Sequence, residues 1–107
     1  MSNVLVNAPK AAKPGEVVEV KALILHPMET GFRPGTNGSI IPRNIIERFV
    51  ATWNGEEVFS MAFSPAIAAN PFVSFFFAVG KESGTLRLRW TGDESFAAEE
   101  QVAIAVG

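Results

Sequence analysis

The chain has 107 residues, a net charge of −2 and only 19% charged residues, and this length predicts one domain spanning residues 1–107. Its nine lysines and arginines are scattered, which argues against nucleic acid as a partner, and no apolar run approaches the ~18 residues of a membrane span. The absence of cysteine excludes disulfides, thiolate metal sites and thiol nucleophiles.

The predicted elements are strands, recognised by alternating apolar side chains or by apolar runs between turn residues. In chain order they are Val4–Val6, Val17–Leu25, Ile45–Trp53, Val58–Phe63, Phe72–Val79, Thr85–Thr91 and Phe96–Val106. Asn54–Gly55 predicts a tight hairpin turn, because both positions of a type I′ turn need a positive φ. Pro65–Ala69 is compatible with a short helical turn. About seven strands with regularly spaced turns predict an all-β fold, an immunoglobulin-like antiparallel β-sandwich.

Two of these strands carry large hydrophobic side chains on the face that a two-layer sandwich exposes to solvent. Leu23 and Leu25 lie opposite the apolar face of their strand, and Phe72 and Phe76 lie opposite the apolar face of theirs. Either loops cover these side chains or they contact a partner protein. The alternation alone leaves open whether the two strands share a sheet.

The polar residues predict no active site. His26 is the only histidine, and a multi-histidine metal site therefore cannot form. A Ser–His–Asp arrangement would need the only aspartate, Asp93, which already fits a Gly92–Asp93 turn. No phosphate-binding glycine loop and no nucleophile elbow is present. We expect no catalytic residue, no metal and no cofactor; an enzyme using His26 and Glu29 is the weakest alternative.

The segment His26–Asn44 joins two strong strands and is longer than a hairpin needs. Asn37–Gly38 predicts a small hairpin inside it. It is either a proline-stiffened loop or a recognition arm, and arginine and methionine are favoured at interfaces. As an arm it would offer Met28, Phe32, Arg33 and Arg43. An alternative function is a small ligand- or glycan-binding module using the 26–44 loop, although Trp53 is predicted to point inward.

The same segment carries a family resemblance. Residues 21–31, KALILHPMETG, resemble the KALIxHPMETG motif of the SoxZ family. The similarity continues, in the same order, through IPRNII at 41–46, NGEEVF at 54–59, ANPF at 69–72 and ESGTL at 82–86. A chain of motifs in order is far more specific than any one of them.

The resemblance implies an immunoglobulin-like, non-catalytic subunit of the SoxYZ carrier, which holds sulfur intermediates during thiosulfate oxidation. SoxY would be the partner in a heterodimer, and its C-terminal cysteine arm would carry the sulfur between the other Sox enzymes, which would make transient contacts. The chain shows no signal peptide, so we expect it to reach the periplasm with SoxY. Without SoxY, a homo-oligomer is a further expectation. The predicted partner interface consists of Leu23, Leu25, Met28, Phe32, Arg33, Arg43, Phe72 and Phe76.

Overall fold

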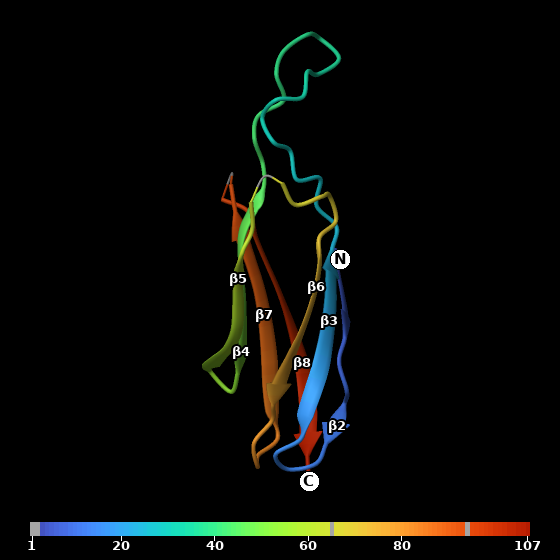
Figure 1. Cartoon of the computed structure of the whole chain (residues 1–107), viewed down its shortest axis with the longest axis vertical. Helices are drawn as coiled ribbons and strands as arrows, with labels where there is room; N and C mark the ends of the chain where they lie inside the picture. Colours follow the sequence, from blue (N-terminus) through green and yellow to red (C-terminus); the bar gives the residue numbers. More distant parts are fainter. Residues whose placement is uncertain (1–2, 65, 94) are drawn as a thin grey trace.

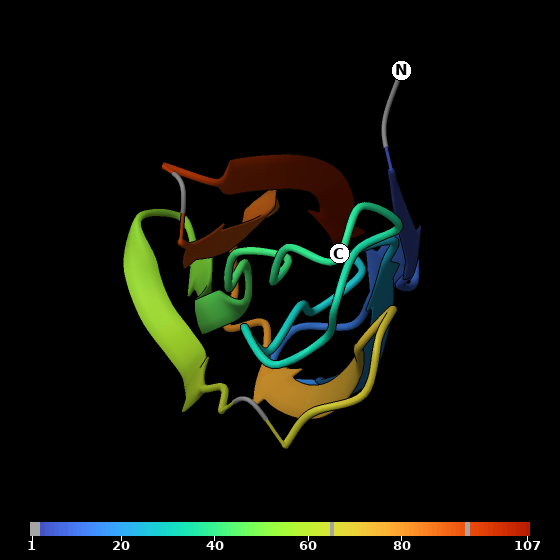
Figure 2. The same cartoon turned by 90° about the horizontal axis from the view of Figure 1, so that it is seen from above.

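The computed structural model describes residues 3–64, 66–93 and 95–107, and these contain eight strands and no helix. The strands are β1 (Val4–Asn7), β2 (Ala11–Ala12), β3 (Val17–Ile24), β4 (Ile46–Trp53), β5 (Glu56–Ala62), β6 (Phe72–Ala78), β7 (Gly84–Gly92) and β8 (Ala97–Val106). Sheet A has the order β1-β3-β6, and sheet B has the order β2-β8-β7-β4-β5. The sheets face each other (Figures 1 and 2), which confirms the predicted β-sandwich.

Alternation along the strands places the core between the two sheets. Buried and exposed residues alternate along β6 and β7, because successive side chains of a strand point to opposite faces. The ring of Phe49 on sheet B lies 5.9 Å from Phe75 on sheet A and 4.9 Å from Trp90 on β7. Phe49 and Trp90 are both fully buried. Aromatic packing between the sheets therefore fixes which face of each sheet is turned outward.

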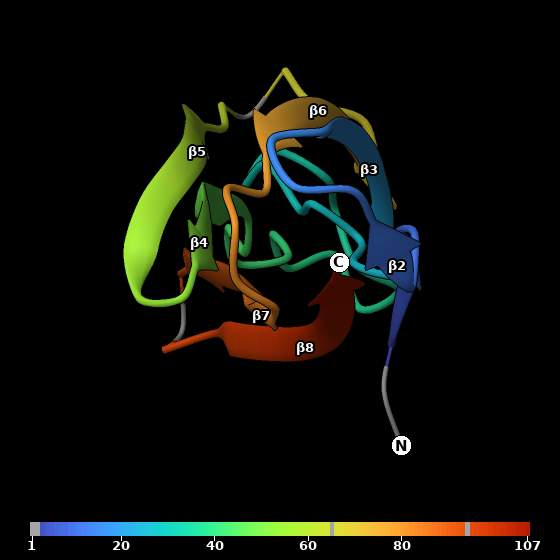
Figure 3. The ribbon, with the colours of Figure 1, turned by 90° about the horizontal axis from the view of Figure 1, so that it is seen from below.

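The β4–β5 connection is the predicted tight turn, since Asn54 has φ +50° and Gly55 has φ +85°. Strand β2 was not predicted, because two residues are too short to show any alternation. It pairs in parallel with the end of β8, with Ala11 opposite Ala105 (Figure 3). The described residues 66–69 form a turn rather than a helix, and Pro65 lies outside the described residues.

Residues 26–44 form an arm that leaves the end of β3, projects beyond the sandwich and returns into β4 (Figure 1). The molecule accordingly measures 58 Å along its longest axis and 24 Å and 19 Å along the others. The predicted hairpin is present at the tip: Pro34 bridges Ile40, and Gly38 has φ +84°. The Ile41 N–H donates to the Arg33 carbonyl at 2.8 Å. The arm is therefore a hydrogen-bonded structure with its own register.

Candidate partner-binding surface

The outer face of sheet A brings together the hydrophobic side chains that the sequence placed on the exposed side. Leu23 lies opposite Leu5 on one neighbouring strand and opposite Phe72 on the other, so the three form a row across the sheet. Phe76 lies on the same face of β6, four residues beyond Phe72. Leu5, Phe72 and Phe76 are 66%, 59% and 62% exposed. We call the surface formed by Leu5, Leu23, Phe72 and Phe76 the apolar face.

The apolar face is hollowed at the arm end of sheet A. A shallow depression of about 310 Å³ is lined by Leu5, Val6, Asn7, Lys21, Leu23 and Phe72. Leu25, which is 51% exposed, follows the end of β3 and lines a different depression, together with residues 96–100. Exposed apolar surface of this kind in a small domain marks an interaction site, and aromatic side chains are enriched in interface cores. The surface can therefore bind a partner mainly by apolar contact.

Two members of this surface were missed by the sequence analysis. Leu5 lies in a strand of four residues, too short for its outward orientation to be assigned, and Val17, which is 61% exposed, begins β3. The outer face of sheet B is different in character: Thr52, Arg87 and Gln101 lie in one row across β4, β7 and β8. Apolar side chains are thus concentrated on one outer face of the sandwich, as expected for a specific contact surface.

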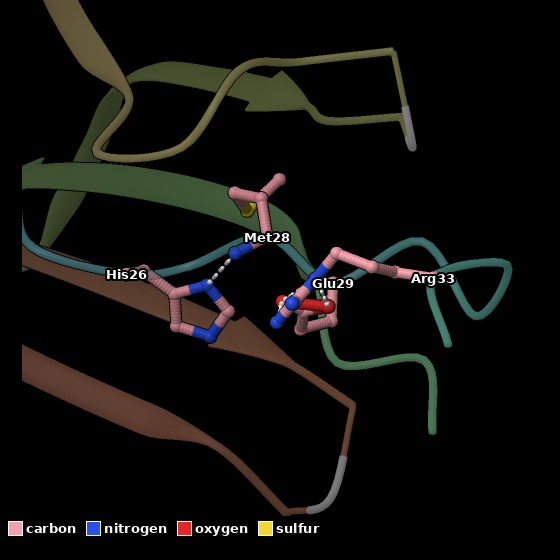
Figure 4. A network of polar contacts seen from close by, with 4 residues as sticks. All are labelled: His26, Met28, Glu29 and Arg33. Carbon is pink, nitrogen blue, oxygen red and sulfur yellow. Dashed lines mark hydrogen bonds and ion pairs between the residues drawn. The ribbon is translucent and has the colours of Figure 1, made fainter. Parts of the chain in front are cut away.

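Met28 was expected at the interface, and this prediction is wrong. Its side chain is 5% exposed, and its sulfur accepts a hydrogen bond from the Ile46 N–H at 3.3 Å. The Met28 N–H donates to Nδ1 of His26 at 3.0 Å (Figure 4). Met28 has φ +54°, a conformation that turns the chain sharply after Pro27 and directs the methionine into the core. It anchors the arm instead of contacting a partner.

Arg33 and Arg43 lie at the surface, where each is held by a carboxylate. The Arg33 guanidinium binds Glu29 through two nitrogens, the shorter contact being 2.7 Å (Figure 4). Arg43 contacts Asp93 at 2.8 Å. These hydrogen bonds hold the pKa of the Glu29 and Asp93 carboxyls below their ordinary values.

The two ion pairs act at the base of the arm, where Glu29 also bridges Asn44. Arg33 and Arg43 therefore brace the arm, which presents two large hydrophobic side chains among polar and charged ones. Phe32 is 83% exposed and Ile40 is 56% exposed. Exposed ion pairs of this type contribute little to stability because water screens them, so the backbone bridges share in holding the arm.

His26 lies in the core at the base of the arm and is 4% exposed. Its Nδ1 accepts the Met28 N–H, so the neutral ring carries its proton on Nε2. The ring packs edge-on against Phe96 at 4.7 Å. Burial lowers the pKa of His26, and the Asn44 side chain partly opposes this shift. These contacts describe a structural histidine that positions Met28.

The neutral state of His26 predicts a pH dependence of stability. Its folded pKa lies below the unfolded value of 6.5, so the unfolded chain binds the proton more readily. The free energy of unfolding is therefore expected to be highest above that value and to fall as the pH drops below it. In urea titrations across this range, His26→Asn, which keeps an acceptor for the Met28 N–H, should show a flatter dependence. An unchanged slope in this variant would contradict the assignment, because Glu29 and Asp93 titrate at lower pH.

Among residues 3–64, 66–93 and 95–107, no three histidine, aspartate or glutamate side chains gather so that they could hold a metal ion. In the part of the chain that the structure describes, no helix is long and apolar enough to cross a membrane. Trp53 is 8% exposed, and its indole N–H donates to the Val79 carbonyl at 2.9 Å, so it forms no exposed platform for a sugar. The described geometry favours a binding surface over a small-ligand site.

Several solved structures share the fold. Superoxide reductase (neelaredoxin) from Ignicoccus hospitalis is 19% identical, with a TM-score of 0.75 over 98% of this chain and 80% of that chain. The sulfur carrier protein SoxY from Chlorobium limicola f thiosulfatophilum is 14% identical, with a TM-score of 0.69 over 100% of this chain and 81% of that chain. Fibronectin(III)-like modules of Clostridium thermocellum CbhA are 17% identical, with a TM-score of 0.58 over 96% and 94%. At these identities the likeness establishes the fold alone.

The family follows from the sequence itself. No curated protein matches the chain. A family model described as "Sulphur oxidation protein SoxZ" matches residues 6–103, which includes every strand of the sandwich except the ends of β1 and β8. The motifs from residue 21 to residue 86 all lie within this match. The chain is therefore a member of the SoxZ family, and its role is in Sox sulfur oxidation.

Proposed function

We propose that this chain is the non-catalytic subunit of a SoxYZ carrier, and that it binds SoxY through the apolar face. The observation that carries the proposal is the row of Leu5, Leu23 and Phe72, exposed on one outer face of a sandwich whose family acts in sulfur oxidation. Burying apolar surface stabilises a complex by about 25 cal/mol per Å², before the cost of association. The SoxY structure from Chlorobium limicola f thiosulfatophilum has the same fold, which supports a contact between two sheet faces.

In this proposal the two subunits of the carrier have different roles. The C-terminal cysteine arm of SoxY carries the sulfur intermediates, and this chain supplies the folded base. The chain has no cysteine, so it offers no thiol that could take the bound sulfur by exchange. We place the complex in the periplasm, reached together with SoxY, in line with the family resemblance.

The arm provides a second contact surface within the same proposal. Its tip exposes Phe32 and Ile40, and the ion pairs at its base hold it in place without a partner. A braced arm loses little conformational entropy on binding, which favours contact with the other Sox enzymes that visit the carrier. The arm projects past the end of the sandwich, so an enzyme at its tip and SoxY on sheet A can bind at the same time (Figure 1).

The proposal is tested in the native host. A strain without this gene should lose thiosulfate oxidation, and an affinity-tagged copy should restore it and co-purify with SoxY. A copy carrying His26→Ala should also restore turnover in proportion to the protein present, because His26 is assigned a structural role. Normal thiosulfate oxidation in the deletion strain, or a tagged chain that restores growth without SoxY bound to it, would overturn the proposal.

A further inference from the structure

The chain contains two Asn–Gly steps, and each lies at the tip of a hairpin: Asn37–Gly38 in the arm and Asn54–Gly55 between β4 and β5. An asparagine that precedes glycine is chemically labile, because the glycine backbone nitrogen can attack the side-chain amide and glycine has no Cβ to hinder the approach. Both asparagines are exposed, so exposure does not distinguish them. Their hydrogen bonds do distinguish them, and these decide which step reacts in the folded chain.

Asn54 is held by contacts outside its own turn. Its side-chain oxygen accepts the Thr85 N–H at 3.0 Å, and its own N–H donates to the Thr85 carbonyl at 3.1 Å, so the residue is hydrogen-bonded twice to β7. The amide also lies directly against Gly84, where a Cβ atom would collide with it. Ring closure would first have to withdraw this amide from β7. The fold therefore opposes the reaction at Asn54.

In the described part of the chain, the hydrogen bonds of the Asn37 side chain stay within its own turn. Its Oδ1 accepts the Ser39 N–H at 3.1 Å, and the Gly38 N–H donates to the Gly35 carbonyl at 3.1 Å. A Cβ atom on Gly38 would meet open space. Opening this turn disturbs no strand of either sheet, and exposed loop tips open at the lowest cost in free energy. The Gly38 nitrogen and the Asn37 amide are therefore the pair that is free to react.

We propose that Asn37 is a self-modification site, at which the folded chain converts an amide into a carboxylate. The Gly38 backbone nitrogen loses its proton to solvent base and attacks Cγ of Asn37. The new N–Cγ bond closes a five-membered succinimide ring, and the side-chain nitrogen leaves as ammonia.

Water then opens the ring at one of its two carbonyl carbons. Opening at Cγ breaks the new N–Cγ bond and gives aspartate. Opening at the backbone carbonyl breaks the original peptide bond and gives isoaspartate, in which the main chain runs through the former side chain. Water is the only co-reactant, and no oxidant or reductant takes part.

Either product changes the surface at the tip of the arm. Both add one negative charge, and isoaspartate also lengthens the backbone of the turn by one atom. The tip exposes Phe32 and Ile40, and a carboxylate beside them makes apolar contact less favourable because it must be desolvated. This weakening of the contact with a visiting enzyme rests on the proposed function, whereas the modification itself does not. The apolar face on sheet A is left unchanged.

Mass spectrometry of the folded chain, incubated in mildly alkaline buffer, measures the two sites separately. Trypsin places Asn37 and Asn54 in different peptides, residues 22–43 and 49–81, and fragmentation assigns the modified residue. The mass gain of an amide becoming an acid should appear at Asn37 about fivefold faster than at Asn54 or more, the factor that one net hydrogen bond contributes to a rate. In Asn37→Gln, whose longer side chain would have to close a less favourable six-membered ring, peptide 22–43 should keep its mass.

The same chain unfolded in guanidinium chloride is the matched control, because it keeps the sequence and removes the contacts of Asn54 with β7. There the two sites should convert at similar rates. Asn54 converting as fast as Asn37 in the folded chain would overturn the inference, as would the same rate ratio in the folded and unfolded chains. A folded chain whose peptide 22–43 stays unmodified for a time that converts the unfolded chain would also overturn it. These outcomes are independent of whether the chain binds SoxY.

Discussion

Replacing Leu23 with aspartate is expected to weaken the binding of SoxY by about 30-fold or more, equivalent to the ~2 kcal/mol of an interface hot spot. Leu23 is the centre of the row between Leu5 and Phe72, so SoxY bound on the apolar face would cover it completely. A carboxylate buried there without a partner would be strongly unfavourable. Because Leu23 points away from the core, the domain itself should remain folded. Calorimetric titration of purified SoxY into the variant measures the change.

The control for this substitution lies on the opposite side of the sandwich. Ala103 on β8 is exposed and faces outward from sheet B, so Ala103→Asp introduces the same charge on the other outer face. It should bind SoxY like the unmodified chain. Phe76→Asp should resemble Leu23→Asp, since Phe76 lies on the same face. Undiminished affinity in both sheet A variants would show that SoxY binds elsewhere.

Replacing Phe49 with alanine is expected to lower the free energy of unfolding by about 3–5 kcal/mol. Phe49 is fully buried, and its ring contacts Phe59, Phe75 and Trp90, so it joins the two sheets. Its removal deletes apolar contact and leaves a cavity that two sheets cannot easily close. A domain of this size has only about 5–15 kcal/mol of stability, so the loss is a large part of the total. Urea unfolding followed by tryptophan fluorescence measures it.

Phe72→Ala is the matched comparison, because it removes the same side chain from an exposed position on sheet A. Its effect on the free energy of unfolding should be within about 0.5 kcal/mol, as for most surface substitutions. Its affinity for SoxY should nevertheless fall. If Phe72→Ala destabilised the domain as much as Phe49→Ala, the assignment of Phe72 to a binding surface would be wrong.

Strand alternation made most of the fold predictable, and with it three of the four side chains of the apolar face, all except Leu5. The outward positions of Phe72 and Phe76 follow from a period of two, which β6 keeps without interruption. The adjacency of β3 and β6 did not follow, because pairing between strands some fifty residues apart depends on register, which composition does not encode. The missed Leu5 completes the row only once β1 is paired with β3.

The arm shows a different limit of sequence interpretation. Met28 has a residue type favoured at interfaces, but the positive φ that turns it inward depends on the His26 ring and the Ile46 amide. The role of Arg43 depends on Asp93, fifty residues away in sequence. Such contacts arise from the folded chain, so the sequence predicted an arm and its hairpin but not the residues that brace it.

Hydrogen–deuterium exchange of the chain with and without SoxY tests the central claim most directly, because it reports on every strand at once. The account predicts slower exchange in β1, β3 and β6 when SoxY is bound, with β4, β7 and β8 unchanged. Protection confined to sheet B, or none in sheet A, would contradict the assignment of the apolar face as the SoxY-binding surface.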